Sequence, residues 1–300
     1  MDSEGIDQVE LFRSANRKRC QEYALVLQAM GIPAALVNEP GESVLIVHPS
    51  VAPRAADELS RYVDENDGWP PRDELYSNPE AGAYEAATYG LLALLLFFFQ
   101  KSRALSFDWL REGRAQAGLI QEGEWWRAIT ALSLHGDLSH VLSNILFGAL
   151  FSVLLSQVMG AGLAWSSIVF AGALGNYVNA WVQPIEHNSI GASTMVFGAL
   201  GTLAAFQWRL RKRKSFNAAR RFAPLMGGVL MLAFFGFGES TFDRRIDYVA
   251  HITGFLSGAL IGFIHGTWTD PERISPRTQR LFLFGVPAAF AVAWVLALSS

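Results

Sequence analysis

Cysteine and charge are the scarce features of this sequence. The single cysteine, Cys20, excludes an internal disulfide and a metal site built from several cysteines. Charged residues make up 17% of the 300 residues, against about 25% in an average soluble domain, and long stretches after Thr88 contain almost none. The formal net charge of −3 gives no support for nucleic-acid binding, so no nucleic-acid partner is predicted.

Long apolar runs are abundant instead. Hydrophobic residues make up 51% of the chain, and seven runs approach the roughly 20 residues that cross a membrane as a helix. These helices lack the polar face of a helix in a soluble protein, which disfavours the alternative of a buried all-helical soluble core. We therefore predict an all-α polytopic membrane helix bundle with spans at about 84–100, 138–159, 164–182, 192–208, 223–238, 247–266 and 281–298.

Residues 1–68 are predicted to form a small soluble α/β domain. Their polar start lacks the apolar core of a cleavable signal peptide. NRKRCQEYALVLQAMGI indicates a helix, PAALVNEPGESVLIVHP two short strands around a Pro-Gly turn, and VAPRAADELSRYVDEN a second helix. Residues 69–83 are a Pro-rich linker. Cys20 and His48 are interpreted as structural, because the domain shows no chemistry of its own.

Basic residues predict the orientation of the spans. The loop between the fourth and fifth spans, RLRKRKSFNAARR, is rich in Lys and Arg and is therefore expected in the cytoplasm. The loop QPIEHNSIG, between the third and fourth spans, has neither and falls outside. Alternation then places the N-terminus inside and the C-terminus outside.

Polar residues gather at one predicted depth. The second, fourth and sixth spans all run inward, and their first turns carry His140 and Asn144, Ser193, and His251. Ionisable residues inside a membrane are costly, so they are candidates for function. Small residues on the sixth span, Gly254, Gly258 and Gly262, allow close approach of the fourth span, which would bring Ser193 within hydrogen-bond reach of His251.

This arrangement predicts a Ser-His dyad. A serine hydroxyl becomes a nucleophile when a base takes its proton, and His251 is the candidate base. No carboxylate inside the fourth or sixth span is expected to orient it, so a dyad is favoured over a triad. His140, the Asn144 amide and the Ser193 backbone N–H would stabilise an oxyanion at a helix N-terminus. Gly191 would allow a sharp entry into that helix.

Each residue has a plainer interpretation when taken alone. A serine in a membrane helix usually hydrogen-bonds its own backbone, and His140 and Asn144 are also typical of polar contacts between helices. A glycine stripe more often serves packing than function. A metal site at His135, His140 and His251 lacks a carboxylate ligand, so neither a metal nor an organic cofactor is predicted. The combination at one depth is what favours catalysis.

Over residues 84–266 these features resemble the rhomboid family of intramembrane serine proteases. The family's motifs occur in its order. They are the Trp-Arg pair within WWR at 125–127, the H-x4-H-x3-N pattern at His135, His140 and Asn144, the G-x-S motif at Gly191 and Ser193, and A-H-x-x-G-x-x-x-G from Ala250 through Gly258. Two positions depart from the family's pattern, since Phe197 stands where a Tyr is frequent and Thr194 where a Gly is frequent. Phe197 can still stack on His251.

The resemblance implies a reaction and a set of roles. Residues 84–266 would form the six-span protease core, and residues 267–300 a cytoplasmic connection and a seventh span. Ser193 would be the nucleophile, His251 the base, and His140, Asn144 and the Ser193 backbone the oxyanion hole. The implied supporting residues are Gly191, His135, Phe197, Trp126, Arg127, Gly254 and Gly258, and the first loop, 101–137, would lie partly in the outer leaflet.

The implied activity is cleavage of transmembrane segments through an acyl-enzyme, with transmembrane proteins as substrates and the lipid bilayer as surroundings. The oligomeric state is left open. A catalytically silent relative that binds or escorts membrane clients is disfavoured because Ser193 and His251 are both present. A transporter is disfavoured because midplane charges and repeated halves are not seen. The absence of a transit-like segment indicates a bacterial inner membrane.

Overall fold

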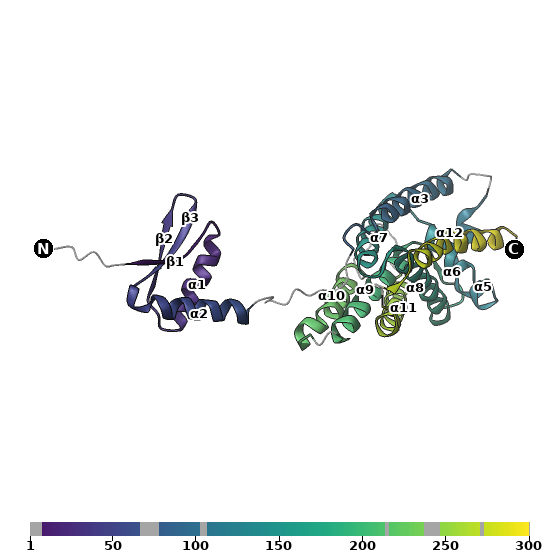
Figure 1. Cartoon of the computed structure of the whole chain (residues 1–300). Helices are drawn as coiled ribbons and strands as arrows, with labels where there is room; N and C mark the ends of the chain where they lie inside the picture. Colours follow the sequence, from purple (N-terminus) through teal and green to yellow (C-terminus); the bar gives the residue numbers. More distant parts are fainter. Residues whose placement is uncertain are drawn as a thin grey trace. The chain divides into compact units, whose positions relative to one another are not determined.

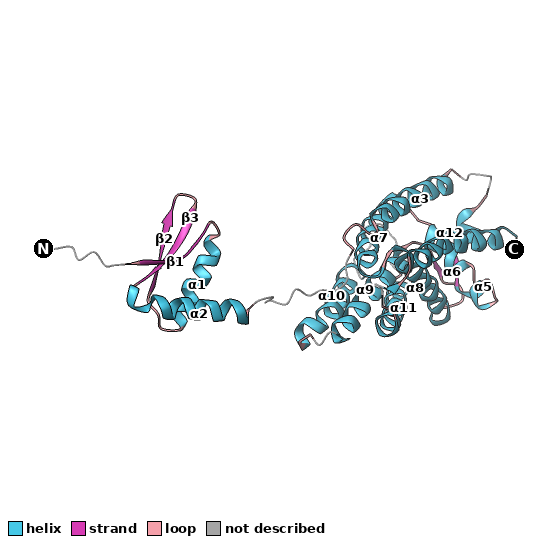
Figure 2. Ribbon diagram, in the orientation of Figure 1, coloured by secondary structure: helices cyan, strands magenta, loops and turns pink. Residues whose placement is uncertain are grey.

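The chain is described here by a computed structural model that covers residues 8–66, 78–102, 107–213, 216–236, 247–270 and 273–299. It divides into two compact units, Met1–Glu74 and Leu75–Ser300 (Figure 1). Strands build a sheet in the first unit, and long helices dominate the second (Figure 2).

The N-terminal unit is the predicted small α/β fold. Its elements are β1 (Val9–Ser14), α1 (Arg17–Ala29), β2 (Ala34–Glu39), β3 (Glu42–Val47), η1 (Pro49–Val51) and α2 (Ala52–Glu65). The strands form an antiparallel sheet in the order β1-β3-β2. Leu45 and Val47 of β3 lie on the face of the sheet that meets the helices. There they pack with Tyr23 and Leu27 of α1 and Leu59 of α2. This core confirms the two predicted helices and the predicted strand pair.

Strand β1 was not predicted. Its sequence, VELFRS, places two apolar residues side by side and so lacks the alternation that indicates a strand. Hydrogen bonds to β3 stabilise this segment as a strand although its own sequence does not alternate. The register of the pairing shifts between Glu10 and Phe12. Arg13 then reaches the carboxylates of Glu10 and Glu39, at 2.7 and 2.6 Å.

In the C-terminal unit a long helix lies at each predicted span. These helices are α3 (Ala83–Lys101), α7 (Leu138–Met159), α8 (Ala161–Val182), α9 (Ser193–Arg213), α10 (Ala218–Gly236), α11 (Tyr248–Trp268) and α12 (Pro276–Ser299). Short elements fold the first loop: α4 (Trp109–Gly113), β4 (Ala115–Gln116), α5 (Ala117–Gln121), α6 (Arg127–Thr130) and η3 (Ala131–Ser133). Strand β4 pairs with β5 (Asn188–Ser189), which precedes α9. The last two positions of the predicted fifth span, 237–238, lie outside the described residues.

Among the described residues, five helices are long and apolar enough to cross a membrane: α3, α7, α8, α11 and α12. Helices α9 and α10 are not among them. In α9, arginine and lysine residues at the C-terminal end lower the mean hydropathy. The chain is a multi-pass helical membrane protein, and the count of seven spans stays a prediction.

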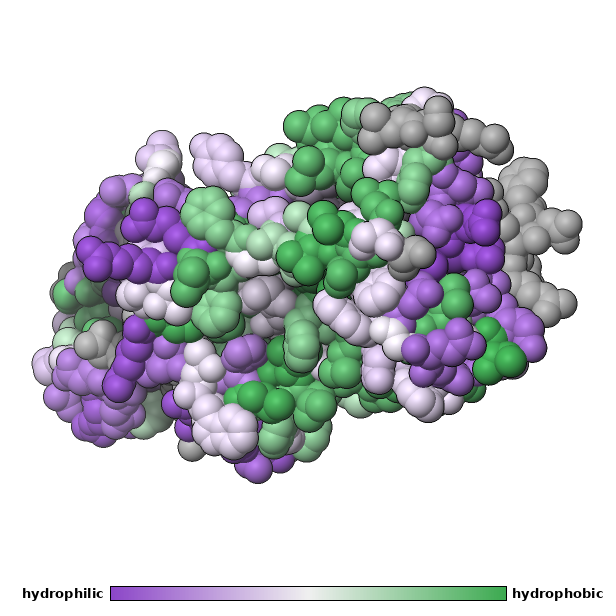
Figure 3. All heavy atoms as spheres, turned by 90° about the vertical axis from the view of Figure 1, so that its right-hand side faces the viewer, coloured by the Kyte–Doolittle hydropathy of each residue, from purple (hydrophilic) through white to green (hydrophobic). Residues whose placement is uncertain are grey.

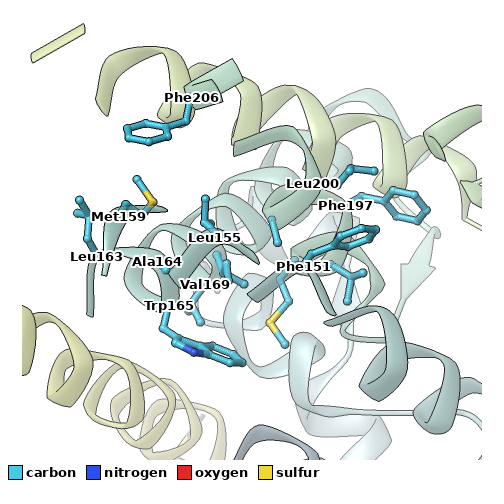
Figure 4. Packing of buried hydrophobic residues seen from close by; sticks show 14 of the residues in the cluster. Phe151, Leu155, Met159, Leu163, Ala164, Trp165, Val169, Phe197, Leu200 and Phe206 are labelled. Atoms are coloured by element: carbon cyan, nitrogen blue, oxygen red, sulfur yellow. The ribbon is translucent and has the colours of Figure 1, made fainter. Parts of the chain in front are cut away.

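Helix α9 lies in the middle of the bundle. It contacts α7, α8, α10 and α11, and the side chains around it form the main buried cluster (Figure 4). Phe151 and Leu155 of α7 and Trp165 of α8 belong to this cluster together with Phe197 and Leu200 of α9. Large apolar side chains are instead exposed on the outer helices, such as Leu281 and Val295 of α12. Apolar side chains also form broad areas on the face in Figure 3. The helices that surround α9 therefore present the surface suited to lipid.

Helices α9 and α11 touch along their small residues, as predicted. A Cβ added at Gly254, Gly258 or Gly262 of α11 would collide with a backbone carbonyl of α9, namely those of Thr194, Gly198 and Thr202 in that order. Real Cβ atoms never come so close. These contacts recur every four residues on both helices, so the two backbones run side by side for several turns. The stripe sets the spacing between the helix that carries Ser193 and the helix that carries His251.

Candidate active site

Ser193 is the first residue of α9, and Gly191 shapes the turn that leads into it. Gly191 has a φ of +127°, a backbone conformation that side chains disfavour. Its N–H donates to the carbonyl of Ala131 (3.0 Å). A Cβ at this position would stand 2.7 Å from His140 Nε2 and 3.6 Å from Ser193 Oγ. The imidazole of His140 and the hydroxyl of Ser193 therefore both lie beside the backbone of Gly191, which has no side chain.

His251 stands in the first turn of α11, beside the first turns of α9. Its side chain is buried, and its ring lies against that of Phe197, with centroids 4.4 Å apart and planes at 34°. Because Phe197 follows Ser193 by one helical turn, this stacking places His251 next to the N-terminal end of α9. The close α9–α11 packing holds both residues at the same level of the bundle.

Asn144 lies one turn after His140 on α7. Its side chain is buried, and the amide nitrogen Nδ2 has no hydrogen-bond acceptor within the described residues. Its backbone carbonyl accepts the hydroxyl of Tyr89 (3.1 Å), which anchors the residue to α3. A buried amide donor without an acceptor is costly, and such donors are typical of sites that bind an anionic group.

His135 lies just before α7, and its ring contacts the ring of His140. It is 1% exposed, and its ring meets the His140 ring edge-on, with centroids 5.3 Å apart. Burial, and to a smaller extent the neighbouring His140, lowers the pKa of the His135 imidazole to about 3. His135 is therefore neutral at physiological pH. Its place between the first loop and His140 fits a supporting residue.

Gln100 holds the backbone of His135, and sequence reasoning missed it. The side-chain amide donates to the His135 carbonyl (2.7 Å) and accepts from the His135 N–H (3.1 Å). Gln100 is buried near the end of α3. A polar residue that closes the apolar run LLALLLFFFQ was the available signal, but its partner lies 35 residues away.

Trp126 and Arg127, the Trp-Arg pair of the sequence analysis, lie at the beginning of α6 in the first loop. Arg127 is 4% exposed, and its guanidinium donates to the carbonyls of Glu112 (2.8 Å) and Arg111 (3.1 Å). It also forms an ion pair with Glu124. Trp126 caps α6. These bonds join α6 to the segment around α4 within the first loop.

Asp247 is a polar residue that the sequence analysis did not single out. The helices α9 and α11 contain no carboxylate, as expected. Asp247, at the first position of the predicted sixth span, lies just before α11 and caps it by accepting the Ala250 N–H (3.0 Å). Its Oδ2 also lies 2.7 Å from His187 Nε2 and accepts from Asn179 (3.0 Å). Both partners are too far away in the chain to be predicted from the local sequence pattern. The carboxylate thereby ties the loop before α9 to the beginning of α11.

The charge of Asp247 is expected to stabilise the fold. Burial opposes ionisation, yet the hydrogen bonds from Ala250 and His187 hold the pKa of the Asp247 carboxyl below its usual range. A group with a lowered folded-state pKa stabilises above its unfolded pKa, and this contribution disappears as the pH falls through the folded pKa. Asn caps helices as well as Asp does, so Asp247→Asn removes the charge and retains the cap.

We expect Asp247→Asn to lower the unfolding free energy by about 1–2 kcal/mol at pH 7, and the difference from wild type to shrink below about pH 4. Thermal unfolding in detergent across pH measures both. Asp270→Asn, which removes the ion pair with exposed Arg273, is the control and should change little. An Asp247→Asn deficit that is constant down to pH 3 would contradict the role of the charge.

The fold and the site define a helical, polytopic membrane protein with a serine and histidines gathered at one end of the bundle. Residues 122–268 match the rhomboid domain. Rhomboid protease GluP of Bacillus subtilis is 32% identical over 152 residues, covering 50% of this chain and 29% of that protein. Rhomboid-like protease 3 of Toxoplasma gondii is 27% identical over 185 residues, covering 61% and 67%.

Rhomboid-like protein 11, chloroplastic, of Arabidopsis thaliana is 30% identical over 154 residues, which cover 47% of this chain and 51% of that protein. Residues 122–268 of this chain are therefore a rhomboid domain. The chain spans only part of the length of each of these relatives. Residues 122–268 lie in the C-terminal unit, which carries Ser193 and His251.

Proposed function

We propose that this protein is an intramembrane serine protease that cleaves transmembrane segments of other membrane proteins. The observation that carries the proposal is the convergence at Gly191, where the His140 ring and the Ser193 hydroxyl border the same bare backbone. His251, stacked on Phe197 one turn along α9, adds the base. The names of the relatives GluP and Rhomboid-like protease 3 support the same class of activity.

The reaction follows from these positions. His251 takes the proton of the Ser193 hydroxyl as Oγ attacks the scissile carbonyl, and a tetrahedral oxyanion forms. The Ser193 N–H at the beginning of α9, the His140 ring and the unpaired Asn144 amide are the proposed donors to this oxyanion. His251 then gives its proton to the leaving amine, and an acyl-enzyme remains. Water, deprotonated by His251, hydrolyses the ester and regenerates Ser193.

The orientation of the site is part of the proposal. Arg211, Lys212 and Arg213 end α9, and Arg220 and Arg221 begin α10, so the end of the bundle opposite Ser193 is the basic one. Basic loops face the cytoplasm. We therefore place Ser193 near the outer face of a bacterial inner membrane, with the N-terminus in the cytoplasm.

The test combines a substrate with a covalent probe. Purified protein in detergent is expected to cleave a tagged single-span membrane protein, and a fluorophosphonate is expected to label it on the peptide that contains Ser193. Labelling without cleavage would mean that the chosen substrate is wrong. Folded protein that neither cleaves nor labels would overturn the protease proposal and favour the silent relative that binds membrane clients.

A further inference from the structure

The seventh span, α12, is fastened to the joint between α7 and α8. The Gln279 side chain donates to the carbonyl of Met159, the last residue of α7, and accepts from the N–H of Leu163 in the first turn of α8, both at 2.9 Å. It thus satisfies backbone groups that both helix ends leave unpaired. Gly160, with a φ of +82°, leaves room for the Gln279 side chain. This contact lies at the end of the bundle opposite Ser193.

At its other end α12 reaches the first loop through Trp294. The indole N–H donates to Ser133 Oγ (3.1 Å). The indole ring packs on Gly113, where an added Cβ would collide with it, and meets the Trp109 ring edge-on at 5.0 Å. Trp294 lies about 22 Å from Gln279 along the helix, at 1.5 Å per residue. Helix α12 therefore links the two ends of the bundle.

Ser133 connects Trp294 to the candidate active site. Ser133 is buried, and while its oxygen accepts from Trp294, its hydroxyl donates to the carbonyl of Thr130 (2.6 Å). Two residues further on, His135 meets the His140 ring, which borders Gly191 and hence Ser193. Trp294 therefore holds the segment that leads directly into the supporting histidine.

Apolar packing of α12 does not account for the hydrogen bond that Trp294 makes. Most of α12 is exposed, including Val292 and Val295. Its fully buried side chains are two alanines, Ala293 and Ala297, while Leu283, Val286 and Phe290 are partly buried against the main cluster. An indole N–H in such a helix is costly without an acceptor. Its bond to Ser133 is therefore a directed contact, which apolar packing of α12 does not supply.

We propose that Trp294 is a positioning residue for the reaction. Through Ser133 it fixes the backbone that carries His135, and with it the His140 ring beside Ser193. This inference rests on the proposed protease function. It also assigns a task to the seventh span, which lies outside residues 122–268 and holds the first loop in place.

Two substitutions remove the same hydrogen bond from opposite sides. Trp294→Phe keeps an aromatic ring at this position but has no N–H, and Ser133→Ala removes the acceptor. Each is expected to lower kcat and the rate of fluorophosphonate labelling about threefold or more with KM unchanged, and the double variant should lose no more than either single variant. Trp294→Ala, which also removes the ring, should lose about tenfold or more. Val295→Ala, on the lipid-facing side, is the matched control and should behave as wild type.

Rates are divided by the amount of labelled enzyme, so that a loss of folded protein does not pass for a loss of rate. Amide hydrogen exchange over residues 131–137 is measured in parallel and should become faster in Trp294→Phe. Wild-type kcat, labelling rate and exchange in Trp294→Phe, with only a lower melting temperature, would overturn the inference. If wild type is inactive the protease proposal fails by itself, and unchanged exchange in the variant would then still overturn the positioning of this segment.

Discussion

Ser193→Ala is expected to abolish substrate cleavage and fluorophosphonate labelling, and His251→Ala to lower both by at least about 10⁴-fold. The reason is that a serine hydroxyl without a base is a poor nucleophile, while the remaining oxyanion donors give only residual catalysis. Cleavage of a single-span test substrate by purified protein in detergent measures the loss. The double variant should be no slower than Ser193→Ala alone, because the two residues act as a unit.

Two matched controls accompany this experiment. Ser139 is an exposed serine at the beginning of α7, and its hydroxyl donates to Asp137, so Ser139→Ala should retain labelling. His48 lies in the N-terminal unit, so His48→Ala should retain cleavage. Persistent labelling of Ser193→Ala, or wild-type cleavage by His251→Ala, would refute the proposed dyad.

Gly258→Val should break the contact between α9 and α11. The Gly258 backbone lies against the Gly198 carbonyl so closely that even a methyl group has no space, and backbone atoms cannot move aside as a flexible side chain can. We expect a loss of at least about 3 kcal/mol of stability and no cleavage, because the helices that carry Ser193 and His251 are forced apart. Thermal unfolding and size-exclusion profiles in detergent measure the first effect.

Gly285→Val is the matched control for this substitution. Gly285 also lies inside a helix, α12, but a Cβ at this position meets nothing within 4 Å. Valine there should fold and cleave as wild type does. If Gly258→Val were to fold with the stability of wild type, the α9–α11 contact would not set the spacing of the site.

The helices were readable from the sequence because their causes are local. Apolar runs alone predicted 138–159, the bounds that α7 has. The period of four in Gly254, Gly258 and Gly262 predicted which face of α11 meets α9, since a stripe of small residues allows one close contact. The positions of Ser193, His140 and Asn144 in the first turns of their helices followed from the same pattern. Their proposed roles are for experiment to establish.

The supports of the site were not readable, because they join residues far apart in the chain. Gln100 holds the backbone of His135, and Asp247 meets His187 across 60 positions. In each case the periodicity of the local sequence does not predict the hydrogen-bond partner. The short helices of the first loop likewise depend on Arg127, whose guanidinium bonds to carbonyls that only the folded loop brings together.

The sequence by itself determined the helices, the small-residue stripe and the level at which Ser193, His140, Asn144 and His251 lie, because apolar length and periodicity decide these within each segment. Only the tertiary structure decided how α12 packs. An apolar helix is compatible with any place at the edge of a bundle, and hydropathy does not select among them. The position of α12 is fixed by the hydrogen bonds of Gln279 with the α7–α8 joint and of Trp294 with Ser133.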